Sequence, residues 1–169
     1  MRLQGDGKVL WRKFVHSSKG AVTLRHVMGT DDNAIMACGG LVSTGSPYSA
    51  HLAKVTMTGT DVWQRDYPGA RARQLSQLVG NGNAGVAAAG WSRTVGGVKQ
   101  PWLAAFAHNG TLLWSKLIEQ PSSSEAEYLR RDKDGTFVLF GSRFVGTLKR
   151  PWLQRAGPLG DPIHRADIA

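Results

Sequence analysis

Basic side chains recur at matching positions on two predicted loop segments. Arg93 and Lys99 flank the first segment, and Arg143 and Lys149 flank the second, 50 residues further along the chain. Trp91 lies next to the first pair. Cationic side chains neutralise phosphate or carboxylate groups, and aromatic rings stack on flat ligands. These five residues are therefore candidate ligand-binding residues for an acidic protein or a nucleic-acid backbone. The alternative is that solvated loops repeat because the unit was duplicated.

The overall charge is compatible with such a partner. The chain of 169 residues has 21 Lys and Arg against 12 Asp and Glu, which gives a formal net charge of +9. An excess of this size favours anionic partners. The basic residues are spread along the chain in short clusters, which is equally typical of a solvated surface.

Two local motifs suggest other ligands but fit turns better. Gly80–Gly85 matches the glycine pattern of dinucleotide-binding loops, which requires a helix after it, whereas an apolar strand is predicted here. We therefore expect a hairpin turn. Asp31–Asn33 and Asp132–Gly135 are acidic, but no distal glutamate completes a calcium loop. Asx-turn chemistry accounts for both segments, and we expect no metal.

Catalytic chemistry has little support in the sequence. Cys38 lies in an apolar run, and Glu125 and Glu127 lie on one face of a predicted strand, where the matching residues are Gln74 and Ser76. The five histidines are far apart and have no metal-ligand spacing: His16, His26, His51, His108 and His164. We expect no catalytic residue and no cofactor.

The elements that position these residues follow from an internal repeat. Gly59–Arg65 matches Gly110–Lys116, and their tryptophans, Trp63 and Trp114, are 51 residues apart. A related copy, Gly7–Lys13, lies upstream, and a degraded copy lies downstream, where His164 occupies the Trp position. Apolar runs repeat with the same period at Ile35–Gly39, Val86–Gly90 and Phe137–Gly141. A fixed period of this length is typical of a repeat protein.

Each unit is predicted to contain four β-strands. For the middle unit we assign Gln74–Val79, Gly85–Gly90, Trp102–His108 and, from the preceding turn, Asp61–Tyr67. The second strand is apolar at nearly every position, which indicates burial on both faces. The Trp strand alternates in polarity, which favours an outer position.

Four-stranded units cannot bury both faces alone, so copies must stack, and a period near 50 favours a β-propeller over a solenoid. The sequence therefore predicts an all-β fold, with blades of four antiparallel strands in a single domain, 1–169. The units run over about 7–58, 59–109 and 110–159, with a degenerate terminal strand at 160–169.

The repeat resembles the bacterial Trp-containing β-propeller repeats, and distantly the blades of quinoprotein-type propellers. The shared features are a glycine turn, a short apolar strand that ends in glycine, a Trp-Leu strand and a Gly-x-x-x-Trp-x-Lys segment. The resemblance implies a fold and no activity. The metal ligands and cofactor-stacking tryptophan of the quinoprotein enzymes have no counterpart here.

About three to 3.5 blades per chain are too few for a closed ring, which needs roughly four to eight. Exposed blade faces and strand edges favour association, so we expect a homodimer that completes a ring. The alternative is that the chain is a piece of a longer propeller.

We therefore expect a non-enzymatic scaffold or binding module that acts through its loop faces, possibly on an acidic partner. The alternatives are an enzyme with a central-channel site, or a carbohydrate-binding propeller that uses Trp91 and Tyr48. The single cysteine, the lack of a signal peptide at the N-terminus and the absence of a long apolar run favour a cytoplasmic protein without a membrane segment.

Overall fold

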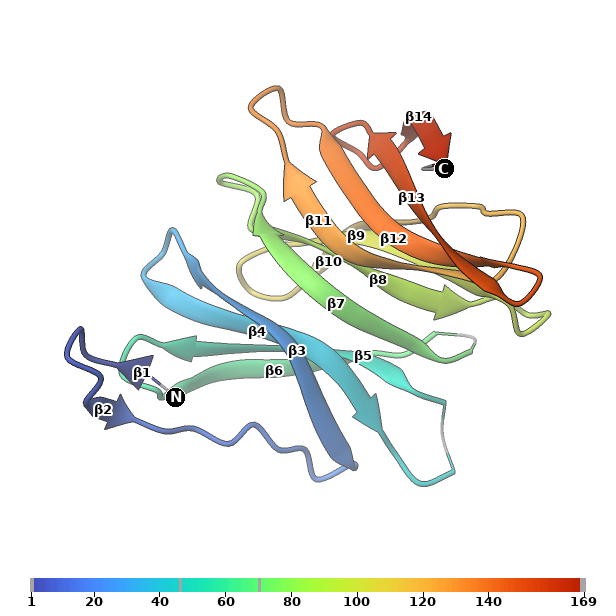
Figure 1. Cartoon of the computed structure of the whole chain (residues 1–169). Helices are drawn as coiled ribbons and strands as arrows, with labels where there is room; N and C mark the ends of the chain where they lie inside the picture. Colours follow the sequence, from blue (N-terminus) through green and yellow to red (C-terminus); the bar gives the residue numbers. More distant parts are fainter. Residues whose placement is uncertain (1, 46, 70, 168–169) are drawn as a thin grey trace.

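The computed structural model describes residues 2–45, 47–69 and 71–167, which form strands joined by turns and linkers (Figure 1). No helix occurs within these ranges, so the all-β expectation is confirmed. The described strands are β1 (Arg2–Leu3), β2 (Val9–Trp11), β3 (Ala21–Thr30), β4 (Ala34–Val42), β5 (Ser49–Thr56), β6 (Asp61–Tyr67), β7 (Arg73–Gly80), β8 (Val86–Arg93), β9 (Lys99–Phe106), β10 (Leu112–Leu117), β11 (Ser124–Arg131), β12 (Phe137–Val145), β13 (Leu148–Ala156) and β14 (Pro162–Asp167).

Strands that follow one another along the chain pair side by side. Among the described residues they make three four-stranded antiparallel sheets: the first sheet (β3–β6), the middle sheet (β7–β10) and the last sheet (β11–β14). β1 and β2 form a separate antiparallel pair, the N-terminal hairpin. Four-stranded antiparallel units are therefore confirmed.

One strand assignment was wrong. Asp61–Tyr67 was expected in the middle unit, but it forms β6 and pairs with β5 in the first sheet. The middle sheet ends instead on β10, which pairs with β9. The tight turn at Gly59 is a hairpin turn, and such a turn holds a strand against the strand that it directly follows.

The sheets stack on one another, with their first strands close together and their fourth strands apart (Figure 1). β7 contacts β3 and β4, and β11 contacts β7 and β8, whereas the fourth strands of neighbouring sheets meet weakly at most. We call β3, β7 and β11 the inner strands and β6, β10 and β14 the outer strands. The Trp strand is therefore an outer strand, as predicted, and this divergence is compatible with propeller-like blades.

The turn before each outer strand is built in the same way. Gly59 N–H donates to Thr56 O at 3.0 Å, and Gly110 N–H donates to Ala107 O at 2.8 Å. The φ angles of the two glycines are +88° and +82°, in the left-handed region that other residues rarely adopt. This conformation explains the glycine of the Gly-x-x-x-Trp pattern.

The tryptophans of β2, β6 and β10 each pack on the equivalent turn of the sheet that follows. Trp63 Nε1–H donates to His108 O at 3.1 Å. Trp11 of the N-terminal hairpin donates in the same way to Met57 O at 2.9 Å. Trp114 lies over Gly160, where an added Cβ would come within 2.6 Å of the indole ring. The recurring tryptophan therefore connects successive sheets at their outer edge.

Each inner strand contains a β-bulge at an equivalent position. The pairing register shifts between Leu75 and Gln77 in β7, so Ser76 is the bulged residue. Shifts in β3 and β11 leave Arg25 and Glu127 at the matching places. A bulge re-aims the side chains around it and kinks the strand. The three bulges therefore turn polar residues toward the same edge of the stack.

Two apolar cores hold the sheets together. One, between the first and middle sheets, contains Met36, Leu75, Trp102 and Phe106, and Trp63 packs against its side. The other, between the middle and last sheets, is built from ten buried residues: Ala87, Ala89, Leu103, Ile118, Ala126, Leu129, Phe137, Leu139, Trp152 and Ala156. β8 is buried from Val86 to Ser92 because both of its faces lie in a core, as the apolar run predicted.

The outward faces of the two end sheets are open. Phe140 of β12 is 37% exposed, whereas Ala89, at the equivalent place in β8, is fully buried. Leu24 of β3 is 42% exposed, whereas its counterpart Leu75 is fully buried. The difference arises because no sheet among the described residues covers the outward faces on which Phe140 and Leu24 lie.

Candidate functional site

Three of the five predicted ligand-binding residues lie together. The Lys99 ammonium lies 4.4 Å from the centre of the Trp91 ring and 3.3 Å from Glu125 Oε2. Lys149 Nζ lies 3.1 Å from Glu127 Oε1. The sequence did indicate this cluster, but it missed the two glutamates that engage both lysines.

The two predicted arginines are placed differently. Arg93 Nη1 donates to Gly97 O at 2.6 Å and so bonds to its own turn. Arg143 lies in β12, where it is paired in the backbone register with Ser124 and with Arg150. Neither arginine lines the hollow that Trp91 and Lys149 line, and Lys99 lies beside it.

This hollow, which we call the inner groove, has a volume of about 340 Å³ and crosses the bulged part of the inner strands. Its lining residues are Arg25, Gln74, Ser76, Trp91, Glu125, Glu127 and Lys149. Nearly all of these side chains are polar or charged, so the groove suits a hydrophilic ligand. The lining contains two cations, Arg25 and Lys149, and two carboxylates. The carboxylates pair with Lys149 and with Lys99, which lies beside the groove, so Arg25 is left without an acidic partner among the described residues.

Gln74 has a hydrogen-bonding group available in the groove. Its side chain is only 6% exposed, and its Nε2 makes no hydrogen bond within the described residues. A buried donor without an acceptor is costly. A ligand with a carboxylate, carbonyl or hydroxyl oxygen at this wall would supply the acceptor.

Arg25 contributes the uncompensated charge. It occupies the bulge of β3, its side chain is exposed, and it makes no hydrogen bond or ion pair with the other described residues. Lys99 and Lys149 are held by glutamates, so Arg25 is the cation of the groove best able to pair with a ligand.

Glu127 is held as a carboxylate. The hydrogen bond from Ser142 Oγ, at 2.5 Å, lowers its pKa below the ordinary value; partial burial opposes this effect, and Lys149 adds to it. An ionised carboxylate at neutral pH accepts hydrogen bonds and cannot serve as a general acid. In this structure the Glu127 carboxylate accepts from Ser142 and pairs with Lys149.

Trp91 does not offer an open ring face. Lys99 lies over the ring, Tyr48 packs beside it with the ring centres 6.2 Å apart, and the whole residue is 9% exposed. Sugar recognition by stacking needs a free aromatic face. Trp91 therefore serves as a wall that positions Lys99.

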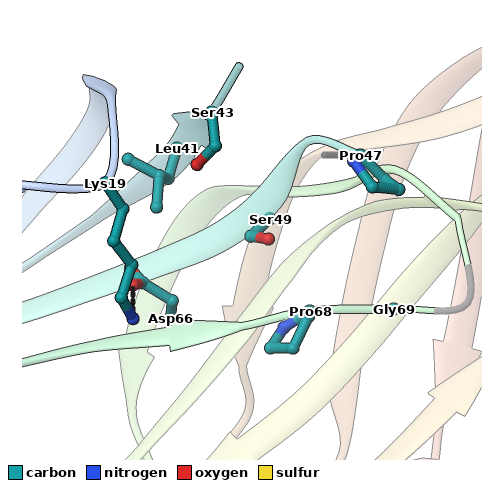
Figure 2. A pocket seen from close by; sticks show the side chains of 8 residues that line it. All are labelled: Lys19, Leu41, Ser43, Pro47, Ser49, Asp66, Pro68 and Gly69. Carbon is teal, nitrogen blue, oxygen red and sulfur yellow. Dashed lines mark hydrogen bonds and ion pairs between the residues drawn. The ribbon is translucent and has the colours of Figure 1, made fainter. Parts of the chain in front are cut away.

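A second hollow lies on the loop side of the first sheet (Figure 2). Its volume is about 410 Å³, and Leu41, Pro47 and Pro68 form its apolar walls. Figure 2 shows Lys19 and Asp66 paired at one side, with Nζ to Oδ2 at 3.0 Å. The other carboxylate oxygen of Asp66 lies 2.8 Å from Nδ1 of the buried His51. The charge of Asp66 is thus used by the protein itself.

We expect the Asp66→Asn variant to lose about 1–2 kcal/mol of unfolding free energy at neutral pH. Burial alone would raise the pKa of Asp66, but hydrogen bonds from His51 and Lys19 outweigh it and lower that pKa. A carboxyl group whose pKa is lowered by folding stabilises the folded state at pH values above its pKa in the unfolded chain. It loses this contribution as the pH falls through its pKa in the folded protein. The difference in unfolding free energy between wild type and Asp66→Asn should therefore become smaller at acidic pH. Urea unfolding at neutral and at acidic pH measures this difference.

The exposed Asp31 provides the matched control, because it carries the same charge in a surface turn. Asp31→Asn should leave the urea midpoint nearly unchanged throughout this pH range. If the stability difference between wild type and Asp66→Asn stays the same at every pH, the ionised Asp66 carboxylate is not what stabilises this region.

The other motifs weighed in the sequence have structural roles. Gly80–Gly85 joins β7 to β8, so it is a hairpin turn, as expected. Asp134 accepts hydrogen bonds from both N and Oγ1 of Thr136, as in an Asx turn. Cys38 is fully buried, and burial raises the pKa of its thiol to about 12, which leaves it unreactive.

The fold defines the chain as an all-β protein of stacked four-stranded antiparallel sheets with a polar groove at its inner strands. Comparison of the sequence with protein-family models and with curated proteins finds no match. Among the described residues, no three His, Cys, Asp or Glu side chains gather in a way that could hold a metal ion. The described part of the chain also contains no helix with the length and apolar character of a membrane span.

Proposed function

We propose that this chain is a non-enzymatic, propeller-like binding module that holds an acidic partner in the inner groove. The observation that carries the proposal is the buried Gln74 Nε2, which lacks an acceptor among the described residues in a groove that Arg25 lines without an acidic partner. A carboxylate of the partner accepts from Gln74 and pairs with Arg25. Ser76, at the bulge between them, provides a hydroxyl that can donate or accept.

The two glutamates have a role in this proposal. Glu125 and Glu127 hold the ammonium groups of Lys99 and Lys149 in place, so that Lys149 lines the groove and Lys99 lies beside it, against Trp91. A fixed cation loses less conformational entropy when a ligand binds than a mobile one does. The groove therefore favours a carboxylate in one position over a diffuse polyanion.

The proposal is tested with a fluorescein-labelled deca-glutamate peptide, followed by fluorescence anisotropy at low and at physiological salt. Arg25→Ala and Gln74→Leu should each weaken binding about tenfold, because each removes one contact to the carboxylate. Binding should also weaken as salt rises.

Lys133→Ala is the charge-matched control, because Lys133 is exposed in the β11–β12 turn, outside the groove. It should leave the affinity unchanged. Equal weakening by Lys133→Ala and Arg25→Ala would show that only the net charge of +9 attracts the peptide, and the groove would then not be the site.

Self-association forms the second part of the proposal. Phe140 and Tyr128 of the last sheet are 37% and 51% exposed, on the face that would meet a following sheet. Within the chain, each such face is covered by the next sheet. A second copy packed there extends the stack toward a closed ring, by the same kind of contact.

Sedimentation velocity at micromolar concentration measures this association. Phe140→Asp should convert dimers into monomers, whereas Phe14→Asp, in the linker before β3 and 76% exposed, should not. A wild-type chain that stays monomeric at these concentrations would refute self-association and would leave the groove proposal intact.

A further inference from the structure

The first sheet carries a histidine at a position where the other two sheets carry a buried tryptophan. His51 of β5 pairs in the backbone register with the glycine that ends the apolar run of β4. Trp102 and Trp152 pair in the same way with the equivalent glycines of β8 and β12. His51 is 1% exposed, and the two tryptophans are 2% and 0% exposed. The first sheet therefore has a smaller, polar side chain at a position that serves packing in the other sheets.

The residue opposite His51 differs from its counterpart in the same sense. In the middle sheet Trp102 is paired with Leu117, whereas in the first sheet His51 is paired with Asp66. One oxygen of the Asp66 carboxylate lies 2.8 Å from His51 Nδ1. A carboxylate only accepts hydrogen bonds, so Nδ1 of the neutral ring carries the proton and Nε2 presents a lone pair. An oriented imidazole therefore takes the place of an apolar cross-strand pair.

His51 also lines a hollow, which we call the linker hollow. Its volume is about 580 Å³, and it is lined by His51, Gln64 and Asp66 of the first sheet and by residues 16–19 of the linker before β3. His51 Nε2 is buried and makes no hydrogen bond within the described residues. A buried acceptor without a donor is costly, so this wall is suited to a ligand that donates a hydrogen bond.

The linker is held over the first sheet by two ion pairs. Lys13 Nζ lies 2.6 Å from Asp61 Oδ2, and Lys19 Nζ lies 3.0 Å from Asp66 Oδ2 (Figure 2). Between them the linker makes a turn, in which Ser17 Oγ accepts from the Lys19 amide at 3.1 Å. Both walls of the linker hollow therefore come from one chain, and the hollow does not require a second copy.

The chemistry of these walls favours a neutral ligand with several hydroxyl groups. The charges of Lys19 and Asp66 compensate each other. His16, Ser18 and Gln64 can each donate and accept hydrogen bonds, as a hydroxyl group does. Among the described residues no three His, Cys, Asp or Glu side chains gather as metal ligands, so a hydroxyl donor suits His51 Nε2 better than a metal ion does.

We propose that the linker hollow binds a neutral polyhydroxylated ligand of the sugar or cyclitol class. One hydroxyl of the ligand donates to His51 Nε2, and Asp66 holds the ring in the tautomer that accepts it. Other hydroxyls bond to Ser18 and Gln64, so recognition rests on hydrogen bonds and needs no aromatic face. The volume of the hollow lies in the usual range of small-molecule sites. This inference goes beyond the inner groove and depends neither on it nor on self-association.

NMR of the intact protein tests the proposal, with glucose, galactose, mannose and myo-inositol as probes. Saturation-transfer experiments should show saturable binding of at least one of the four. In protein with isotope-labelled histidine, the His51 Nε2 resonance should be that of an unprotonated nitrogen and should shift as this probe is added. The proposal fails if none of the four binds, or if the neutral ring carries its proton on Nε2.

A double variant locates the site. His51→Trp combined with Asp66→Leu recreates in the first sheet the pair that Trp102 and Leu117 form in the middle sheet. It should weaken probe binding at least about tenfold, because it fills the hollow and removes the acceptor. Ser18→Ala, at an exposed turn position, should weaken binding several-fold without disturbing the fold. Wild-type affinity in both variants would overturn the proposal.

Two control variants separate this site from the inner groove and from self-association. Lys149→Ala changes the inner groove, and Phe140→Asp changes the face offered to a second copy. Both should bind the probe with wild-type affinity. Loss of binding in Lys149→Ala would place the probe in the inner groove, and loss in Phe140→Asp would place it between two copies. Either result would overturn the linker hollow as the site.

Discussion

Replacing Gly90 with alanine is expected to lower the free energy of unfolding by about 3 kcal/mol. An added Cβ would lie 2.0 Å from Gln74 O and 2.9 Å from Leu75 Cα. Both are backbone atoms at the bulge of β7, so no change of rotamer can relieve the overlap. Gly39 and Gly141 meet the same obstacle at the bulges of β3 and β11. Equilibrium urea unfolding of the variant measures the loss.

Gly96→Ala provides the control for this prediction. The nearest atom to a Cβ at Gly96 is Thr94 Oγ1, at 3.8 Å, so the turn has room for a methyl group. Its urea midpoint should stay close to that of the wild type. If the two alanine variants unfold at the same urea concentration, the close approach at the bulge does not govern stability.

The Trp102→Ala variant should lose about 4 kcal/mol of unfolding free energy. Trp102 is 2% exposed in the core between the first and middle sheets, with the guanidinium of Arg73 4.6 Å from the ring centre. Phe106 meets the ring edge-on, at a centre-to-centre distance of 6.5 Å. Truncation therefore removes apolar contacts, leaves a cavity and exposes the guanidinium to an empty space.

Trp102→Phe is the companion variant, because phenylalanine keeps much of the buried volume. It should lose clearly less stability than the alanine variant in guanidinium chloride unfolding, on the order of 1–2 kcal/mol. Equal losses for the two variants would mean that the volume of the ring is not what stabilises this core.

The fold could be predicted from the repeat because its signals are local. The spacing of Trp63 and Trp114, and the apolar runs that end in Gly39, Gly90 and Gly141, indicated four-stranded units that bury both faces. Periodicity does not specify where a unit begins. For this reason the strand Asp61–Tyr67 was assigned to the middle unit, although it belongs to the first sheet. The Gly59 turn contains the missing information, because it is a hairpin turn.

The candidate site was predicted less completely. Matching positions in two loops indicated Trp91, Lys99 and Lys149, which the structure does bring together. Gln74 and Ser76 were not chosen, because their place in the groove depends on bulges that insert one residue into a strand. The signal that could have revealed these bulges was the spacing of 51 residues between Gly39, Gly90 and Gly141. Each of these glycines lies opposite a bulge that leaves no room for a side chain.

The middle sheet is the only one of the three described sheets with a packed core on both faces. In a stack where each layer touches only its neighbours, the end layers open more readily than the central one. One wall of the groove, with Gln74 and Ser76, belongs to this central layer, and Glu125 and Glu127 belong to an end layer. The Gln74 amide, on which the proposed binding depends, is therefore held by the most constrained of the three four-stranded sheets.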